Sequence, residues 1–293
     1  MKDRFLVEYM EKMKNEMLSK NTIESYLRDI ERFLEFLNCK KISLFSSNID
    51  TIMAYVQELN ERSMANSSIV RNVISVRGFF KYLVERGFME EDPTYNFDIP
   101  KVKRDFPEIL TVEEVDKLLN TPDLDTKKGL RDKAMLEVMY ATGMRVTELI
   151  SLEVFDLNLK LAYIRCIGPK KRERLIPIGT YAIRCLENYL NIRQEVNKNN
   201  LNYLFVNNHG NRLSRQGFWK IIKTYTKEAG IEKNINAYTL RHSFAVHLLQ
   251  NGADIRMVQE LLGHTSVLAT QIYSGVCKKS KIVDMYKKTH PRA

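Results

Sequence analysis

The sequence has little cysteine, and what it has is scattered. Its four cysteines, Cys39, Cys166, Cys185 and Cys277, are far apart and form no CxxC pair and no Cys/His cluster. This spacing argues against a disulfide framework and against a structural zinc site. Free thiols are typical of a reducing compartment, so we expect a cytoplasmic protein with no bound metal.

Long apolar runs are also missing. No stretch is apolar for long enough to cross a membrane. The first residues, MKDRFLVEYM, are charged and lack the apolar core of a signal peptide. We therefore expect no membrane partner.

Positive charge is present but unevenly placed. The formal net charge is +10, and residues 1–104 carry 17 Lys and Arg against 16 Asp and Glu, whereas residues 105–293 carry 29 against 20. A basic C-terminal part favours a polyanionic partner, because cationic side chains bind phosphates and release counterions. A basic protein without such a partner would have the same composition.

Residues 1–90 are predicted to form a helical domain. Apolar residues recur at spacings of three and four in four segments: Phe5–Leu18, Thr22–Leu37, Ile49–Asn60 and Ala65–Arg86. We expect Thr22 or Asn21 to cap the second helix and Gly87 to end the fourth. The basic residues of this bundle either contact a DNA backbone or form a solvated face; they are Lys20, Arg71, Arg77 and Lys81.

Residues 91–109 are predicted to be a linker, and residues 110–293 a second domain. The stretch Glu90–Leu110 has three prolines and no helical periodicity. In the second domain, Thr111 and Glu114 predict a capping box at a helix start. The fold class is mainly α with a small β-hairpin. The further segments expected are helices at Leu130–Tyr140, Arg145–Leu152, Tyr181–Asn191 and Ser214–Ala229, strands at Tyr163–Ile167 and Glu173–Ile178, and a short YLFV strand.

Arg145 is predicted to begin a helix just after a break at Thr142 and Gly143. At a helix start its side chain can reach a ligand. A surface arginine that pairs with Glu148 would explain the same local sequence. The aromatic residues of Ser214–Ala229, which include the single tryptophan, Trp219, are expected to be core rather than base-stacking residues.

The segment Ala237–Val276 contains an arginine at the start of a helical run, a histidine in LLGH and a lone tyrosine. Together these residue types suit one reaction. A guanidinium binds phosphate with paired donors, a histidine adds a hydrogen bond, and a phenol oxygen attacks phosphorus. A covalent phosphotyrosine keeps the bond energy, so DNA can be rejoined without ATP.

Six motifs in this sequence resemble those of the tyrosine recombinases, the phage-integrase-like family, and within them the Xer type. They are ATGMRVTEL (Ala141–Leu149), IGPKKRERLIPIG (Ile167–Gly179), YTLRHSFAVHLL (Tyr238–Leu249), VQELLGH (Val258–His264), TQIYSGV (Thr270–Val276) and HPRA (His290–Ala293). The resemblance covers nearly the whole chain. It implies an N-terminal four-helix SAM-like core-binding domain and a C-terminal catalytic domain.

The resemblance also implies roles for single residues. Arg145 and Arg241 would bind the phosphate, His264 would complete the cradle, and Tyr273 would be the nucleophile. Taken singly, Arg241 could pair with a carboxylate, His264 could end a helix, and Tyr273 could be a buried aromatic. No cofactor is implied, because the two arginines supply the charge that a metal supplies elsewhere.

The hairpin turn departs from the family pattern. The family has Gly-Lys-Gly-x-Lys, with a lysine that protonates the leaving 5′ oxygen, but here Pro169 occupies the lysine slot. Lys170 is the nearest candidate general acid. DNA contacts are expected from the neighbouring Lys171, Arg172 and Arg174. A basic loop that only follows the phosphate backbone is the alternative.

A second departure concerns the His-x-x-Arg motif, whose first position is Tyr238 here. A phenol can donate a hydrogen bond to a phosphate, but it does not shuttle protons near neutral pH as imidazole does. We therefore expect slower cleavage. His242 and His247 are the next candidate substitutes, and their place inside a helical run favours structural roles.

The implied partners are a double-stranded DNA recombination site, a homo- or hetero-tetramer with a second recombinase, and an FtsK-like DNA translocase. The implied activity is site-specific recombination that resolves chromosome dimers. Integration or transposition of a mobile element would use the same chemistry. Thr239–Leu262 also has helix-turn-helix character, so a non-catalytic DNA-binding regulator is a third reading.

Overall fold

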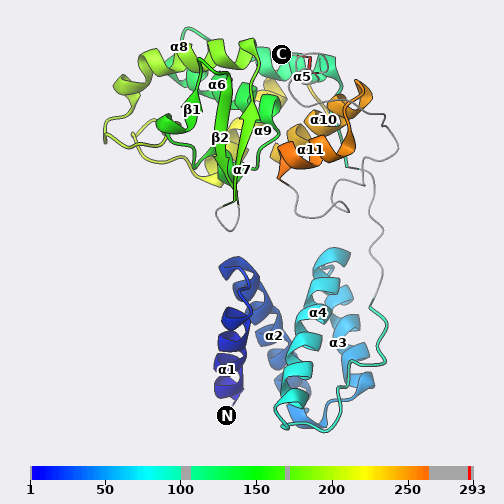
Figure 1. The fold of residues 1–293 in the computed structure, drawn as a ribbon. Coiled ribbons are helices and arrows are strands. Elements are labelled where there is room, and N and C mark those ends of the chain that lie inside the picture. The colour runs from blue at the N-terminus through cyan, green and yellow to red at the C-terminus, as the bar shows by residue number, and fades with distance from the viewer. Residues whose placement is uncertain (1, 100–106, 169–171, 264–289, 292–293) are drawn as a thin grey trace. The chain divides into compact units, whose positions relative to one another are not determined.

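The computed structural model describes residues 2–99, 107–168, 172–263 and 290–291. The chain divides into two compact units, unit 1 (Met1–Asp105) and unit 2 (Phe106–Ala293), coloured blue to cyan and green to orange in Figure 1. No helix among the described residues is long and apolar enough to cross a membrane.

Unit 1 is a helical bundle, as predicted. Its helices are α1 (Lys2–Asn15), α2 (Lys20–Lys40), α3 (Ile49–Glu61) and α4 (Asn66–Glu85), with a 3₁₀ turn at Leu44–Ser46. The side chains of Ile30, Phe33, Phe79 and Phe80 are fully buried between α2 and α4. The predicted cap of α2 was wrong, because the helix begins a turn earlier and the hydroxyl of Ser19 accepts from the N–H of Thr22.

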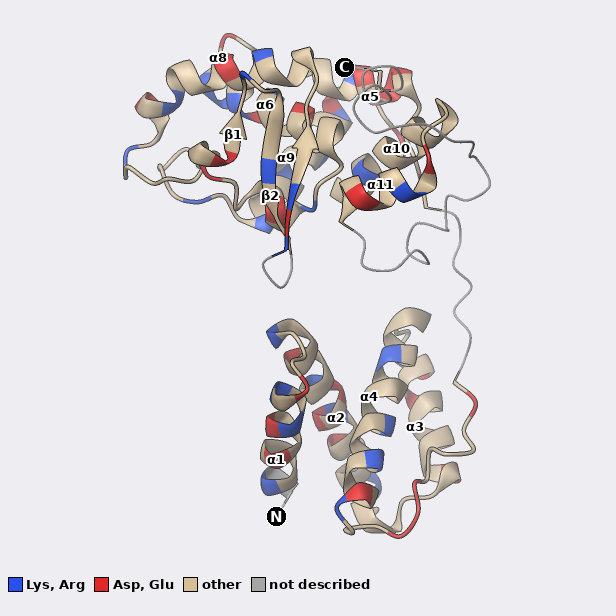
Figure 2. Ribbon diagram, in the orientation of Figure 1, with Lys and Arg blue, Asp and Glu red and all other residues tan. Residues whose placement is uncertain are grey.

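Basic residues recur along α4 (Figure 2), and two of them make contacts inside unit 1. Arg71 donates two hydrogen bonds, of 2.8 and 2.9 Å, to the buried carboxylate of Asp29 on α2. Arg77 donates to the carbonyl oxygens of Thr94 and Phe97 after α4. Both guanidinium groups therefore hold the bundle together, whatever else they contact.

Unit 2 is built around α6 (Lys127–Thr142), which is buried along nearly its whole length. Around it lie α5 (Val112–Asn120), α8 (Thr180–Val196), α9 (Arg215–Glu228), α10 (Ala237–Gln250) and α11 (Ile255–Leu262). The sheet is antiparallel in the order β1 (Leu157–Asn158), β2 (Tyr163–Ile167), β3 (Glu173–Pro177), and Cys166 lies opposite Arg174. The predicted capping box of α5 is present, since Thr111 and Glu114 exchange hydrogen bonds.

Three local predictions for unit 2 were wrong. The helix after Gly143 is the short α7 (Val146–Leu149), because Arg145 is its extended N-cap residue. YLFV is not a strand, since only Tyr203 and Val206 make isolated bridges, to Glu153 and Arg212. The side chain of Trp219 is 51% exposed, because the buried face of α9 runs through Phe218, Ile222 and Tyr225 and leaves position 219 on its flank.

Candidate active site

The turn between α6 and α7 places the first candidate arginine. Gly143 ends α6 with φ +57°, a left-handed conformation that glycine adopts without strain. A Cβ at this position would lie 2.3 Å from Cδ1 of Phe244 on α10. The turn therefore needs glycine twice over, for its conformation and for its packing.

Arg145 follows this turn and is tied to Glu148. The backbone N–H of Arg145 donates to Oε2 of Glu148 at 2.6 Å, and Nη1 donates to Oε1 at 3.0 Å. The Arg145 side chain is 27% exposed, whereas that of Glu148 is 3% exposed. The ion pair between Arg145 and Glu148 that the sequence suggested is therefore present, but its carboxylate is buried rather than on the surface. It leaves the guanidinium reachable from solvent.

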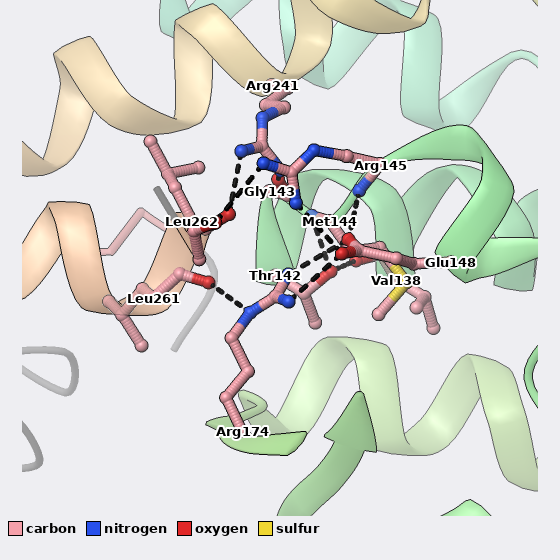
Figure 3. A network of polar contacts seen from close by, with 11 residues as sticks. Val138, Thr142, Gly143, Met144, Arg145, Glu148, Arg174, Arg241, Leu261 and Leu262 are labelled. Carbon is pink, nitrogen blue, oxygen red and sulfur yellow. Dashed lines mark hydrogen bonds and ion pairs between the residues drawn. The ribbon is translucent and has the colours of Figure 1, made fainter. Parts of the chain in front are cut away.

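Arg174 reaches the same carboxylate from β3 (Figure 3). Its Nη1 and Nη2 donate to the two oxygens of Glu148 at 3.0 and 2.9 Å, and its Nε donates to the carbonyl oxygen of Leu261 at 2.8 Å. The side chain is 12% exposed. Arg174 therefore joins β3, α7 and α11.

Arg241 enters the same network from the buried face of α10. Its Nη1 donates to the carbonyl oxygen of Gly143 at 2.6 Å, and its Nη2 donates to that of Leu262 at 2.7 Å. Figure 3 shows Arg145, Arg174 and Arg241 converging on one place from three elements. Both of these hydrogen bonds go to backbone carbonyl oxygens.

The point of convergence is the C-terminus of α11. Leu261, Leu262 and Gly263 each offer a carbonyl oxygen to one arginine: Arg174, Arg241 and Arg145, the last at 3.2 Å. The last carbonyls of a helix lack partners within the helix and carry its negative dipole end, so guanidinium groups suit them. Gly263 ends α11 with φ +62°, and His264 is the next residue of the chain.

The electrostatics of this cluster keep Glu148 ionised. Burial raises the pKa of its carboxyl, but the hydrogen bonds and charges of Arg174 and Arg145 outweigh burial and hold the pKa below its ordinary value. Cys166, opposite Arg174 on β2, interacts with this carboxylate. Burial, together with the negative charge of Glu148, raises the pKa of the Cys166 thiol to about 12, so the thiol stays neutral.

Of the other predicted residues, Tyr238 and Arg172 lie in the part of the chain that the structure describes. Tyr238 is 56% exposed at the start of α10 and lines an open groove with Val146, Trp219 and Arg215. Arg172 is exposed at the base of the hairpin turn, and its carbonyl oxygen accepts from the N–H of Gly168 at 2.7 Å. Lys170, Lys171, His264 and Tyr273 lie outside the described residues.

Of the two histidines inside α10, His247 is buried and His242 is half-buried. His247 is 4% exposed, and its Nδ1 shares a 2.8 Å hydrogen bond with the hydroxyl of Tyr140. Burial lowers the pKa of His247, and burial and then the charge of Arg241 lower the pKa of His242. His290, from the HPRA motif, is also buried, with its ring 4.9 Å from that of Tyr140.

The sequence predicted Glu148 only as a possible surface ion-pair partner of Arg145, and it predicted that Arg174 binds DNA. A signal was available in the alternation of β3. Leu175 is exposed and Ile176 is buried, so Arg174 shares the inward face with Ile176. The carbonyl oxygens at the end of α11 carry no side-chain signal, so nothing in the sequence indicated them.

Family models match both units of the chain. The model described as "Phage integrase family" matches residues 108–279, and that described as "Phage integrase, N-terminal SAM-like domain" matches residues 6–87. The chain is 45% identical to the Tyrosine recombinase XerD of Halalkalibacterium halodurans over 280 residues, which cover 94% of this chain and 93% of that protein. It is also 45% identical to the Tyrosine recombinase XerD of Listeria monocytogenes over 286 residues, which cover 94% of each.

Solved structures share the fold. The XerH site-specific recombinase bound to a palindromic difH substrate, in a post-cleavage complex, matches with a TM-score of 0.77 at 24% identity, covering 93% of this chain and 81% of that one. The XerA recombinase matches at 28% identity over the full length of both chains, with a TM-score of 0.54.

Proposed function

The chain belongs to the phage integrase family and is a site-specific tyrosine recombinase, and from this premise we propose which residues carry its chemistry and what it acts on. Tyr273 is the nucleophile. Its oxygen attacks the scissile phosphorus, a 3′-phosphotyrosine bond forms, and the 5′ oxygen leaves. Attack by a 5′ hydroxyl on that bond then rejoins the strand and frees the tyrosine.

Arg145 and Arg241 bind the non-bridging oxygens and stabilise the charge that grows on them in the transition state. The observation that carries this proposal is their convergence at the end of α11, next to His264 in the chain. A guanidinium stays charged at any working pH, so it can take the place of a metal ion at a phosphate. His264 adds a hydrogen bond to the same phosphate.

The hairpin between β2 and β3 supplies the leaving-group chemistry and part of the DNA contact. Lys170 protonates the departing 5′ oxygen, and Lys171 and Arg172 follow the DNA backbone. Arg172 is exposed, as a backbone contact requires. Tyr238 donates a hydrogen bond to the phosphate in place of the family's histidine.

We further propose that the protein resolves chromosome dimers in the cytoplasm. It would act at a recombination site as a tetramer, with a second copy or a second recombinase, and with a DNA translocase as a further partner. Support comes from the relatives, which are named Tyrosine recombinase XerD and match over nearly their whole length. Integration of a mobile element uses the same chemistry, but none of these relatives is named for it.

A nicked suicide substrate tests the nucleophile. The wild-type protein should form a covalent protein–DNA adduct that survives a denaturing gel, and Tyr273→Phe should form none. Both proteins should bind the DNA equally well in a shift assay, because one hydroxyl differs between them. An adduct that persists in Tyr273→Phe would move the nucleophile to another residue.

A further inference from the structure

Arg174 is the residue whose surroundings fit its expected role least. A side chain that follows the DNA backbone outside the active site presents its guanidinium to solvent, as the exposed Arg172 can. The guanidinium of Arg174 faces a buried carboxylate and a helix end, and only 12% of its side chain is exposed. Its contacts lie within the protein.

These contacts connect the parts of the site that come from different elements. Two donors of Arg174 fix both oxygens of Glu148, and Glu148 in turn holds the backbone N–H and the Nη1 of Arg145. The third donor fixes the carbonyl oxygen of Leu261. The two carbonyls that follow in the chain accept from Arg241 and Arg145.

We propose that Arg174 is a positioning residue for DNA cleavage, which sets Arg145 through Glu148 and sets the end of α11 that precedes His264. The inference rests on the proposed function of Arg145, Arg241 and Tyr273. Arg174 itself contacts neither the DNA nor the reacting atoms. Its position also links the start of β3, and so the hairpin that carries Lys170, to the arginine cluster.

The planar fork of arginine is what the role requires. One ammonium group cannot bind both oxygens of Glu148 and the Leu261 carbonyl in the same geometry. Arg174→Lys keeps the positive charge but not this geometry, so it should recover only part of the cleavage rate that Arg174→Ala loses. Without Arg174, the buried Glu148 carboxylate loses two charged hydrogen bonds, and Arg145 loses its fixed place.

The test separates the cleavage rate from DNA affinity. Single-turnover adduct formation is measured at saturating suicide substrate, below the unfolding temperature of each variant, and the Kd is measured by a shift assay. Arg174→Ala should slow cleavage by about 100-fold, which is the scale of a displacement of about 1 Å in an active site. Its Kd should stay within about threefold of wild type, since no phosphate contact is lost.

Arg165→Ala is the matched control. Arg165 lies on the neighbouring strand β2 and donates two hydrogen bonds to the buried carboxylate of Asp156, at 3.1 and 2.9 Å, away from the arginine cluster. Its loss should lower the unfolding temperature without changing the cleavage rate. Arg172→Ala provides the opposite comparison. The loss of a DNA contact should raise the Kd and weaken its salt dependence, without changing the cleavage rate of bound DNA.

Two results would overturn this inference and leave the proposed function standing. In one, Arg174→Ala raises the Kd and cleaves bound DNA at the wild-type rate, which makes Arg174 a DNA contact. In the other, Arg165→Ala slows cleavage as much as Arg174→Ala, which makes the effect one of general stability. If the wild-type protein forms no adduct, the proposed function fails first, and this inference fails with it.

Discussion

Tyr238 is the residue at which this chain departs most visibly from the proton chemistry of its family. It lies at the exposed start of α10, two residues after the N-cap Asn236, and its ring lines a groove with Trp219. A side chain in this setting can be exchanged without disturbing the core. The position therefore isolates one chemical property, the ability to accept a proton.

Tyr238→His should raise the single-turnover cleavage rate, by up to about 100-fold, the lower end of what a positioned acid or base contributes. Imidazole can accept the proton of Tyr273 near neutral pH, whereas a phenol does not act as a base there. Tyr238→Phe is the control, because it removes only the hydroxyl, and it should cleave no faster than wild type. An unchanged rate in Tyr238→His would place proton removal elsewhere.

At this scale the sequence predicted residue types better than their contacts. Arg145 and Arg241 do come together, as the motif pattern required. Trp219 was expected in the core and is half exposed. Which positions of a helix are buried depends on the elements that pack against it, and periodicity does not identify those elements. Arg174 faces inward for a related reason, since the alternation of β3 outweighs its charge.

The element that places the site is the α6–α7 turn. Its glycine is demanded by a left-handed φ and by the closeness of Phe244 and Leu262, whose nearest atoms would lie 2.3 and 2.9 Å from a Cβ. The carbonyl of the same residue accepts from Arg241. Strain here would therefore affect both stability and the proposed phosphate site.

Gly143→Ala should lower the unfolding free energy of unit 2 by about 2–5 kcal/mol. Roughly 1–2 kcal/mol of this comes from the left-handed conformation, and the rest comes from overpacking, which costs about 1–3 kcal/mol. Gly230→Ala is the matched control, because Gly230 has φ +66° and nothing lies within 4 Å of its Cβ position. Urea denaturation measures both, and equal losses would show that Phe244 moves aside without cost.

Elements were predicted well where a local signal exists. The side chains of Thr111 and Glu114 predict their capping box, and the conformational preference of glycine predicts the end of α6 at Gly143. Prediction failed where tertiary contact decides. The extent of α7 depends on Glu148 folding back onto Arg145, and β1 exists only because Leu157 and Asn158 pair with β2.

At the scale of the whole molecule, two units of different charge make up one recombinase. Residues 1–104 are nearly neutral, and most of the net positive charge lies in residues 105–293, with the arginine cluster. The division into units follows from two separate apolar cores. The sequence predicted the apolar side of the N-terminal helices from periodicity, whereas the arginine cluster needs the meeting of α7, β3, α10 and α11, which only the fold supplies.

The central claim is that Arg145 and Arg241 offset the charge on the scissile phosphate. A methylphosphonate at that position removes one non-bridging charge and leaves the bond to be broken. Single-turnover cleavage of the phosphodiester substrate and of the methylphosphonate substrate, by wild type and by Arg145→Ala, tests the claim most directly. Arg165→Ala is the control for stability.

We predict that Arg145→Ala cleaves the phosphodiester about 10²- to 10³-fold more slowly than wild type, the effect of removing one preorganised donor. On the neutral substrate most of this loss should disappear. An equal loss on both substrates would contradict the account, because Arg145 would then act on something other than the phosphate charge.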